Sequence, residues 1–382
     1  MSTITINPHD LFHGEENLLQ TPQEGTGYCP LQVGEIVGED FQIVRKLGWG
    51  GSSSVWLAKD TSQDFECYAA VKVMTANSTW GILSDEPHEK CYEFEVFDKL
   101  TSPECEGHPS LQYCVEFWRS FYIRSVHGGH YCMALRPYCA TLRQLQCSLH
   151  PRHFPLDIVK RVVRQALSGL ALIHQLGFVH GVDVQSHNLM IDFDPDDYIK
   201  PLSERIGRYI RANPVETPYA VPSGGEYSVP PIVVKSQPLG NLGAEQRLNK
   251  LRVHVADYGS AISIDQTSCG KPLETPLPSR APETVLGQPF SVPVDIWAVG
   301  CLLFQLDRAH SQSERNQAHL SQMMHYFGPF PSCTMSGDLQ RNLALDDQDI
   351  GATAAFMHRC FVFDPSQRAT ASDLLTDNWF QS

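Results

Sequence analysis

The spacing of hydrophobic positions divides the chain into a part typical of strands and a part typical of helices. Between residues 41 and 138 short apolar runs dominate, and Tyr68–Met74 is rich in residues that favour strands. One helical stretch interrupts them around Glu86–Leu100, where apolar side chains recur with the period of a helix: Tyr92, Val96, Phe97 and Leu100. The first part is therefore predicted to be mainly β.

From about Ala140 onward the pattern becomes helical, and Ile158–Leu176 carries one apolar face typical of a long buried helix. Residues 195–248 contain many Pro, Gly and Ser, which predicts an insertion or long loop outside the core. Residues 1–28 are polar without clear periodicity, and we expect a flexible arm there. The pattern thus predicts an α+β protein, with a β-rich small lobe followed by a helical large lobe.

Composition and charge limit the classes of function. Of 382 residues, 42% are hydrophobic, which is enough to bury one large core or two lobes. The formal net charge is −14, which argues against nucleic acid as a direct partner because phosphate backbones attract Lys and Arg. An acidic balance suits a basic ligand, although many soluble proteins are simply acidic.

The cysteines and the apolar runs indicate the compartment. The 12 cysteines are scattered and form no Cys-x-x-Cys pair, as expected for reduced thiols in an intracellular protein. The polar start, Met1–Gln20, does not resemble a signal peptide. The longest apolar stretch, near Ile296–Leu306, has about half the ~20 residues needed to span a bilayer, so we expect no membrane association.

A glycine-rich segment between two predicted strands is the first candidate for chemistry. Gly48-Trp49-Gly50-Gly51 leads into Ser52-Ser53-Ser54-Val55, and glycines there allow backbone N–H groups to approach phosphates. Ser53 replaces the third glycine common in such loops. A single G-x-G is weak evidence taken alone.

Lys72 ends the apolar run Ala69-Ala70-Val71, and a cation on a buried strand needs a partner. It could reach solvent at a strand edge, or it could bind the α- and β-phosphates of a nucleotide and pair with Glu93. We prefer Glu93 to Glu95 because Glu93 shares a helical face with Phe97.

Two further segments carry oxygen ligands. Asp183 and Asn188 are five residues apart in a loop after the long helix, which suits an Asp that accepts a hydroxyl proton and an Asn that binds Mg²⁺. A polar turn with an Asx cap would explain the same residues. Asp257 follows a short strand and precedes Tyr258-Gly259, so it is the main candidate metal ligand, and we expect Tyr258 to pack near Phe97 and His180.

In this order the motifs resemble those of eukaryotic-type protein kinases, over about residues 35–381. Several segments are similar to the SR-protein kinases: the lead-in Tyr28-Cys29-Pro30 to Gly34-Glu35, Lys46–Gly50 with Val55–Asp60, Gly129–Met133 before the hinge, His319–Met323 with Phe327-Gly328-Pro329, and Asp364-Pro365 with Arg368–Ala371. Ala281-Pro282-Glu283 and Asp295-Ile296-Trp297 complete the kinase series.

The resemblance implies a bilobal fold with a kinase N-lobe at 35–138 and a C-lobe at 139–381, and transfer of the γ-phosphate of ATP to Ser or Thr with Mg²⁺. The implied substrates are basic Arg/Ser-rich splicing proteins, and we expect a monomer found in cytoplasm and nucleus. The implied catalytic residues are Asp183, Lys72 and Gln185, and the implied metal ligands are Asn188 and Asp257. Implied nucleotide contacts are Leu47, Gly48, Trp49, Gly50, Gly51, Ser52, Ser53, Val55, Ala70, Lys72, Glu93 and the gatekeeper Leu135.

The chain departs from this family at three places. His180-Gly181-Val182-Asp183 is one residue longer than the family's His-x-Asp, and we expect His180 to be displaced while Asp183 keeps its spacing to Asn188. Gln185 stands where the family has Lys, and loss of one such donor typically costs about 10²–10³ in kcat. Leu277–Arg280 lacks the aromatic that usually precedes the Arg.

These departures leave two alternatives to an active kinase. The first is a weak or dead relative that binds ATP and a basic partner as a scaffold. The second is a small-molecule phosphotransferase, because His180-Gly181 is similar to the loop of antibiotic kinases. The Ala281-Pro282-Glu283 and Asp295-Ile296-Trp297 segments count against the second, since those enzymes lack both.

Overall fold

In the computed structural model, which describes residues 14–84, 86, 90–181, 184–192, 199–221, 232–240, 242, 244–267, 279–285, 287–305 and 347–381, the chain divides into two units. Unit 1 comprises residues 1–90, 116–139 and 195–242, and unit 2 comprises residues 91–115, 140–194 and 243–382. The β-rich and helical halves predicted from the sequence correspond broadly to these units, with segments exchanged between them.

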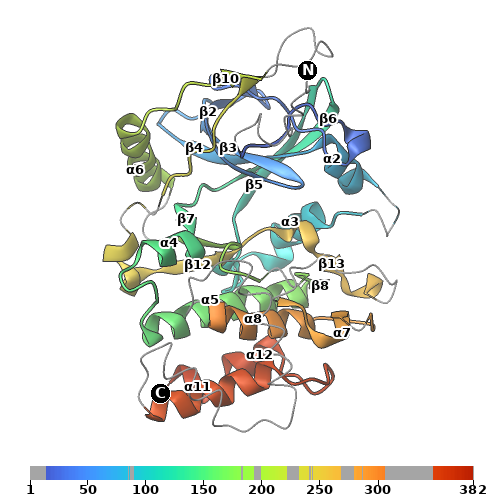
Figure 1. Cartoon of the computed structure of the whole chain (residues 1–382), viewed down its shortest axis with the longest axis vertical. Helices are drawn as coiled ribbons and strands as arrows, with labels where there is room; N and C mark the ends of the chain where they lie inside the picture. Colours follow the sequence, from blue (N-terminus) through green and yellow to red (C-terminus); the bar gives the residue numbers. More distant parts are fainter. Residues whose placement is uncertain are drawn as a thin grey trace, which may run out of the picture. The chain divides into compact units, whose positions relative to one another are not determined.

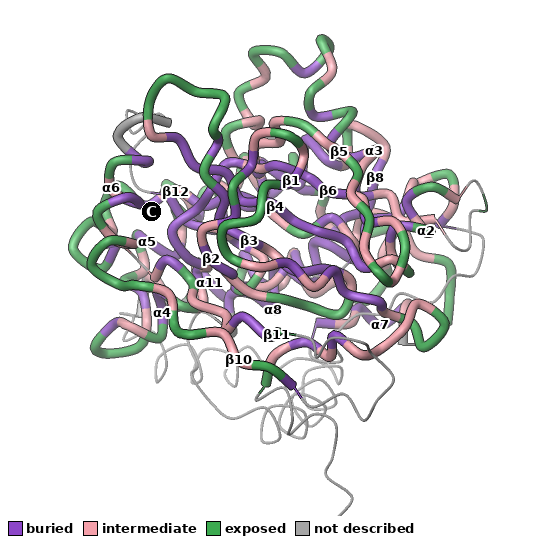
Figure 2. Tube along the Cα trace, turned by 90° about the horizontal axis from the view of Figure 1, so that it is seen from above, coloured by how far each residue is buried: buried purple, intermediate pink, exposed green. Residues whose placement is uncertain are grey.

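Unit 1 is built on a six-stranded antiparallel sheet with the order β1-β2-β3-β4-β6-β5 (Figure 1). The strands are β1 (Ile36–Val37), β2 (Phe41–Gly50), β3 (Ser53–Asp60), β4 (Tyr68–Met74), β5 (Phe117–Ser125) and β6 (Gly128–Leu135). β4 is buried along its whole length (Figure 2), and apart from Lys72 its sequence is the apolar run expected of a central strand.

One face of this sheet forms the core of unit 1. Side chains of alternate residues on neighbouring strands point to the same face, and on this face Trp56, Val71, Val73, Cys132 and Ala134 are buried together. Because residues two apart share a face, Val55, Ala70, Lys72 and Met133 point to the opposite side of the sheet. The sheet therefore separates a packed core from a second face that carries several predicted site residues.

Two expectations for unit 1 are wrong. Within the segment expected to be a flexible arm, residues 14–28 are ordered against the unit, with Leu18, Tyr28 and Glu16 each at most 5% exposed. Within residues 195–248, expected to be a loop outside the core, α6 (Ile199–Ala212), β10 (Tyr219–Ala220) and β11 (Ile232–Val233) form.

The apolar residues between the prolines explain this second difference. Val234 belongs to the core cluster of unit 1, and Gln237 N donates to Lys46 O at 2.8 Å. The Tyr68 amide also donates to Ser203 Oγ on α6, at 3.3 Å. A β-branched run such as Ile232-Val233-Val234 can pair with a strand even when proline-rich sequence surrounds it.

Unit 2 is mainly helical. Its helices are α3 (Glu93–Leu100), α4 (Leu142–Ser148), α5 (Leu156–Gln175), α7 (Pro282–Val285), α8 (Pro293–Gln305), α11 (Asp347–Cys360) and α12 (Ala371–Leu375). Two small antiparallel sheets complete it: β12-β9-β7, from Arg252–Val255, Leu189–Asp192 and Ala140–Thr141, and the pair β13 (Ile262–Ser263) with β8 (Phe178–Val179).

The long helix predicted at Ile158–Leu176 is confirmed as α5, and every residue predicted on its apolar face is buried. It packs against β12, α8 and α12 (Figure 1). The helix predicted around Glu86–Leu100 is shorter than expected and begins at Glu93, while a separate helix, α2 (Ala76–Leu83), belongs to unit 1. Among the described residues no helix has the length and hydropathy to cross a membrane.

Candidate active site

Unit 1 places the predicted nucleotide-binding residues in register across three strands. Gly48 pairs with Val55, and Val55 pairs with Lys72, so these three residues form one row across β2, β3 and β4. Ala70 pairs with Leu135, and both residues share the face that Lys72 occupies. The sheet face opposite the core therefore carries the predicted lysine, the predicted gatekeeper and the small Ala70 together.

The glycine-rich loop is the turn between β2 and β3. Leu47 lies in β2 behind it and is partly buried, Gly50 and Gly51 are exposed, and Ser53 pairs with Gly50 at the start of β3. A Cβ built on Gly48, Gly50 or Gly51 would meet no atom within 4 Å, and none of the three has a positive φ. The space around these positions does not require glycine, and their close approach to a ligand stays a prediction.

Lys72 is 7% exposed although it is charged. A buried ammonium is stable only with compensating partners, and the role of Lys72 in binding phosphate stays a prediction. Glu93 belongs to unit 2, and the pairing of Lys72 with Glu93 stays a prediction.

The two predicted metal ligands of unit 2 lie at the same end of one strand pair. β9 and β12 are antiparallel, and Leu189 pairs with Val255. Asn188 directly precedes β9, and its carbonyl accepts a 2.9 Å hydrogen bond from Ala256 N, next to Asp257. Residues 69 positions apart in the sequence are thus brought together by strand register, one before β9 and one after β12.

Asp257 is exposed and has a φ of 61°, in the left-handed region that is uncommon for residues other than glycine. Such strained backbone clusters at functional sites because it aims a side chain. Among the described residues no group of three His, Cys, Asp or Glu could hold a metal. One carboxylate and one amide fit Mg²⁺ instead, which commonly takes one or two protein ligands together with phosphate oxygens.

Tyr258 packs as predicted. Its ring meets Phe97 edge-on at 5.2 Å and His180 at 5.6 Å between centroids, and its hydroxyl donates to Val255 O at 2.8 Å. The prediction that Tyr258 turns inward is confirmed, and this packing fixes the residue that follows Asp257.

Glu93 opens α3 and is 1% exposed. Its carboxylate lies beside Gly259: a Cβ on that glycine would be 3.7 Å from Glu93 Oε2 and 3.4 Å from Asp257 Oδ1. The Cys91 thiol lies 3.8 Å from Gly259 O. Within unit 2 the predicted Glu93 therefore borders the segment that carries Asp257.

His180 and Gly181, which precede Asp183 in the chain, are held by hydrogen bonds. Asp295 on α8 accepts hydrogen bonds from His180 N at 2.8 Å and Gly181 N at 3.1 Å, and His174 Nε2 lies 2.8 Å from its Oδ2. His180 Nε2 lies 3.1 Å from Ala256 O. These contacts and the Tyr258 ring hold His180 in the core, and its displacement relative to the kinase family stays a prediction.

Gly181 explains part of the unusual loop sequence. Its φ is +97°, and a Cβ there would lie 2.2 Å from Ser260 O, so only glycine fits. Asp183 lies outside the described residues. Gln185 is partly buried, and its carbonyl accepts from Asn188 N at 2.9 Å.

Three other segments that resemble kinase motifs pack against one another in unit 2. Arg368 forms a bidentate pair with Glu283 at 2.7 and 3.0 Å, and both side chains are at most 1% exposed. The Arg368 guanidinium also lies 5.1 Å from the Trp297 ring centroid. A fully buried, bidentate pair ties the Ala281-Pro282-Glu283 segment to the end of the chain.

Sequence reasoning placed Gly181, Asp295 and Tyr28 in motifs but predicted none of their contacts. Asp295 carried a usable signal, because it is an acid inside the apolar helix Pro293–Gln305 and a buried carboxylate requires donors. Gly181 and Tyr28 carried no such signal, since their roles depend on backbone atoms of Ser260 and Gly50 that come near only in the fold.

Comparisons with known proteins agree with this geometry. The protein kinase domain family matches residues 242–380. A serine/threonine-protein kinase SRPK of Physarum polycephalum is 25% identical over 96% of this chain and 91% of that protein. A serine/threonine protein kinase of Aspergillus fumigatus is 24% identical over 96% of this chain and 90% of its own length.

Two further matches cover a shorter segment or the fold alone. The human SRSF protein kinase 3 is 27% identical over 46% of this chain and 30% of its own length. A crystal structure of a kinase domain, 16% identical, superposes with a TM-score of 0.56 over 92% of this chain and 98% of the other.

The fold of the chain is that of a protein kinase domain, and the protein kinase family model matches the part of the sequence from residue 242 to residue 380. Over most of its length the sequence is similar to serine/threonine protein kinases, among them one named SRPK.

Proposed function

We propose that this chain is a catalytically active serine/threonine kinase that uses Mg²⁺-bound ATP and phosphorylates Arg/Ser-rich proteins. The observation that carries the proposal is the meeting of Asn188 and Asp257 at one end of the β9–β12 pair. Asp257 is exposed and has a positive φ, and an exposed carboxylate can reach outward to a metal ion.

The proposed roles follow from charge and reach. Asn188 and Asp257 would hold Mg²⁺, which neutralises phosphate oxygens when bound. Lys72 would bind the α- and β-phosphates, and the loop Gly48–Val55 would cover them with backbone N–H groups. Asp183 would accept the proton of the substrate hydroxyl as its oxygen bonds to the γ-phosphorus and the bond to ADP breaks.

Basic substrates are supported by two observations. The relatives are named SRPK and SRSF protein kinase, and the net charge of −14 favours attraction of polybasic chains. Attraction of this kind weakens as salt screens it, with a Debye length of about 8 Å at 0.15 M ionic strength.

An alternative, a scaffold that binds ATP without turnover, is favoured by Gln185. Its amide keeps an N–H donor but lacks the charge that the family's lysine brings to the transferred phosphoryl group. Substitutions of this type cost about 10²–10³ in kcat, so a slow enzyme and a scaffold must be separated by experiment.

The test incubates the purified chain with Mg-ATP and an Arg-Ser repeat peptide and measures phosphate incorporation. We expect incorporation that is lost in Asp183→Ala and in Asp257→Ala and is unchanged in Asp265→Ala, an exposed acid eight positions after Asp257. Thermal stabilisation by Mg-ATP without incorporation would establish the scaffold instead, and no stabilisation at all would remove both functions.

A further inference from the structure

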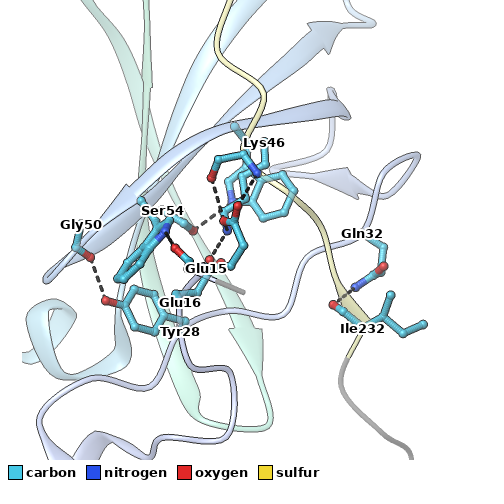
Figure 3. Close-up of polar contacts among 12 residues, drawn as sticks. Glu15, Glu16, Tyr28, Gln32, Lys46, Gly50, Ser54 and Ile232 are labelled. Atoms are coloured by element: carbon cyan, nitrogen blue, oxygen red, sulfur yellow. Dashed lines mark hydrogen bonds and ion pairs between the residues drawn. The ribbon is translucent and has the colours of Figure 1, made fainter. Parts of the chain in front are cut away.

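Residues 14–28, the N-terminal strap, contact the glycine-rich loop at two points. The Tyr28 hydroxyl donates a 2.8 Å hydrogen bond to Gly50 O (Figure 3), and the Trp49 indole N–H donates to Gly14 O at 3.3 Å. The Tyr28 and Trp49 rings meet edge-on at 6.0 Å. Two neighbouring loop residues are thus held by side chain and backbone of the same strap.

The Tyr28 hydrogen bond sets the orientation of one peptide plane. In a trans peptide the carbonyl oxygen and the following N–H point in opposite directions. Because Gly50 O points to Tyr28, the N–H of Gly51 points away from the strap. Gly50 ends β2 and pairs with Ser53, but Gly50 and Gly51 are exposed and have no side chain to restrict them, so the Tyr28 hydrogen bond adds a restraint on the peptide between them.

The strap is itself anchored on the strand that leads into the loop. Lys46 in β2 is fully buried and forms ion pairs with both Glu15 and Glu16, which converge on its ammonium (Figure 3). Glu15 also accepts from Ser236 N at 2.7 Å and Ser236 Oγ at 2.8 Å. Lys46 is two residues before Gly48, so the strap and the loop are fixed to the same strand.

We infer that Tyr28 is a positioning residue for nucleotide binding: it holds the Gly50–Gly51 peptide with its N–H available to a phosphate group. The inference rests on the proposed function, because it assigns the loop to phosphate. A loop held in advance binds more tightly, since the ligand need not order it.

Tyr28→Phe tests this with little change in packing, because only the hydroxyl is removed. Tyr68→Phe is the matched control. Both tyrosines are 3% exposed in unit 1, and Tyr68 donates a 2.7 Å hydrogen bond to Glu66. Tyr68 pairs with Lys59, at the end of β3 away from the loop.

Three measurements are made on the full chain and both variants. Calorimetry gives the Kd for Mg-ATP, and the kinase assay separates KM for ATP from kcat. Hydrogen exchange without nucleotide reports the opening of the amides of residues 49–54. In Tyr28→Phe we expect Kd and KM to rise about 3- to 10-fold, the effect of one hydrogen bond, with kcat nearly unchanged and faster exchange. Tyr68→Phe should match the wild type.

Unchanged Kd in Tyr28→Phe would overturn the inference, and so would equal changes in both variants, which would indicate a general loss of stability. If the wild-type chain binds no Mg-ATP, the proposed function fails and the role in nucleotide binding fails with it. The exchange of residues 49–54 would then decide separately whether Tyr28 holds the loop.

Discussion

The predicted site residues belong to two units of the chain that are organised by different forces. In unit 1 the row Gly48, Val55 and Lys72 is set by backbone pairing between consecutive strands. In unit 2 the segment around His180 is held by the Asp295 carboxylate, which comes from more than 100 positions later in the chain. A ladder of backbone hydrogen bonds tolerates most side-chain changes, whereas a network built on a few side chains depends on each of them. The two regions should therefore respond differently to substitution.

Of the substitutions considered, Lys72→Ala is expected to have the largest effect. The effect should be on the rate of phosphorylation and not on the stability of the fold. Removing the ammonium should lower kcat/KM for ATP by about 10²–10³-fold, the cost of losing one charged donor to the reacting group. The strand should remain, because Lys72 is held in β4 by backbone pairing with Val55 and Met133. The assay is peptide phosphorylation together with the unfolding midpoint.

The control for Lys72→Ala is Lys59→Ala, which removes an exposed lysine from the neighbouring strand β3 and should leave the rate unchanged. Equal rates for wild type and Lys72→Ala would withdraw the assignment of Lys72.

Gly181→Ala is expected to destabilise unit 2, because the backbone of Ser260 leaves no room for a side chain at this position. An alanine there combines a φ of +97° with a Cβ 2.2 Å from Ser260 O. Strain of this type costs of order 1–3 kcal/mol for the dihedral, and the contact with backbone adds to it. We expect a loss of about 3 kcal/mol or more in the free energy of unfolding, measured by urea denaturation.

Gly177→Ala is a matched control for the backbone strain. Its φ is +88°, but a Cβ would meet nothing within 4 Å, so only the cost of the dihedral should appear. If both variants lose the same free energy of unfolding, the close approach of Ser260 to Gly181 does not contribute to the cost of a Cβ at that position.

The same contrast explains what could be predicted from the sequence. Val55 and Lys72 stand on strands whose apolar runs are visible in the sequence, and the short glycine turn that joins β2 to β3 places Gly48 opposite Val55. The packing of Tyr258 on Phe97 was predictable because the helical phase of Phe97 is readable.

Other features depend on contacts that leave little trace in a local pattern. The order of residues 14–28 follows from Glu15 and Glu16 meeting Lys46, and acidic residues in a polar stretch ordinarily indicate solvent. The contribution of Val234 to the core of unit 1 requires a strand contact with β2 from a segment about 190 positions away. Proline-rich sequence around it predicts a loop.

Glu15 and Glu16 give the smallest expected effect and show where unit 1 also depends on distant side chains. Burial raises the pKa of Glu16 above its usual value, against the Lys46 ammonium that lowers it. Although burial also acts on Glu15, hydrogen bonds from Lys46 and Ser236 bring the pKa of that carboxyl below its usual value. Two neighbouring acids on one cation therefore respond to pH with opposite signs.

The pKa of Glu16 is higher in the folded than in the unfolded chain, so its contribution to stability is present at low pH and is lost as pH rises through the folded pKa. Glutamine stays neutral, so Glu16→Gln should gain stability relative to wild type as pH rises from 4 to 8.

For Glu15, with its lowered pKa, the favourable contribution is present at neutral pH and is lost as pH falls. Glu15→Gln should therefore be the less stable variant at pH 7 and approach wild type in acid. Each difference is expected to be on the order of 1 kcal/mol, read from urea midpoints at a series of pH values. If the stability difference from wild type changes with pH in the same direction for both variants, the two carboxylates have equivalent environments beside Lys46, and the assignment of opposite pKa shifts is wrong.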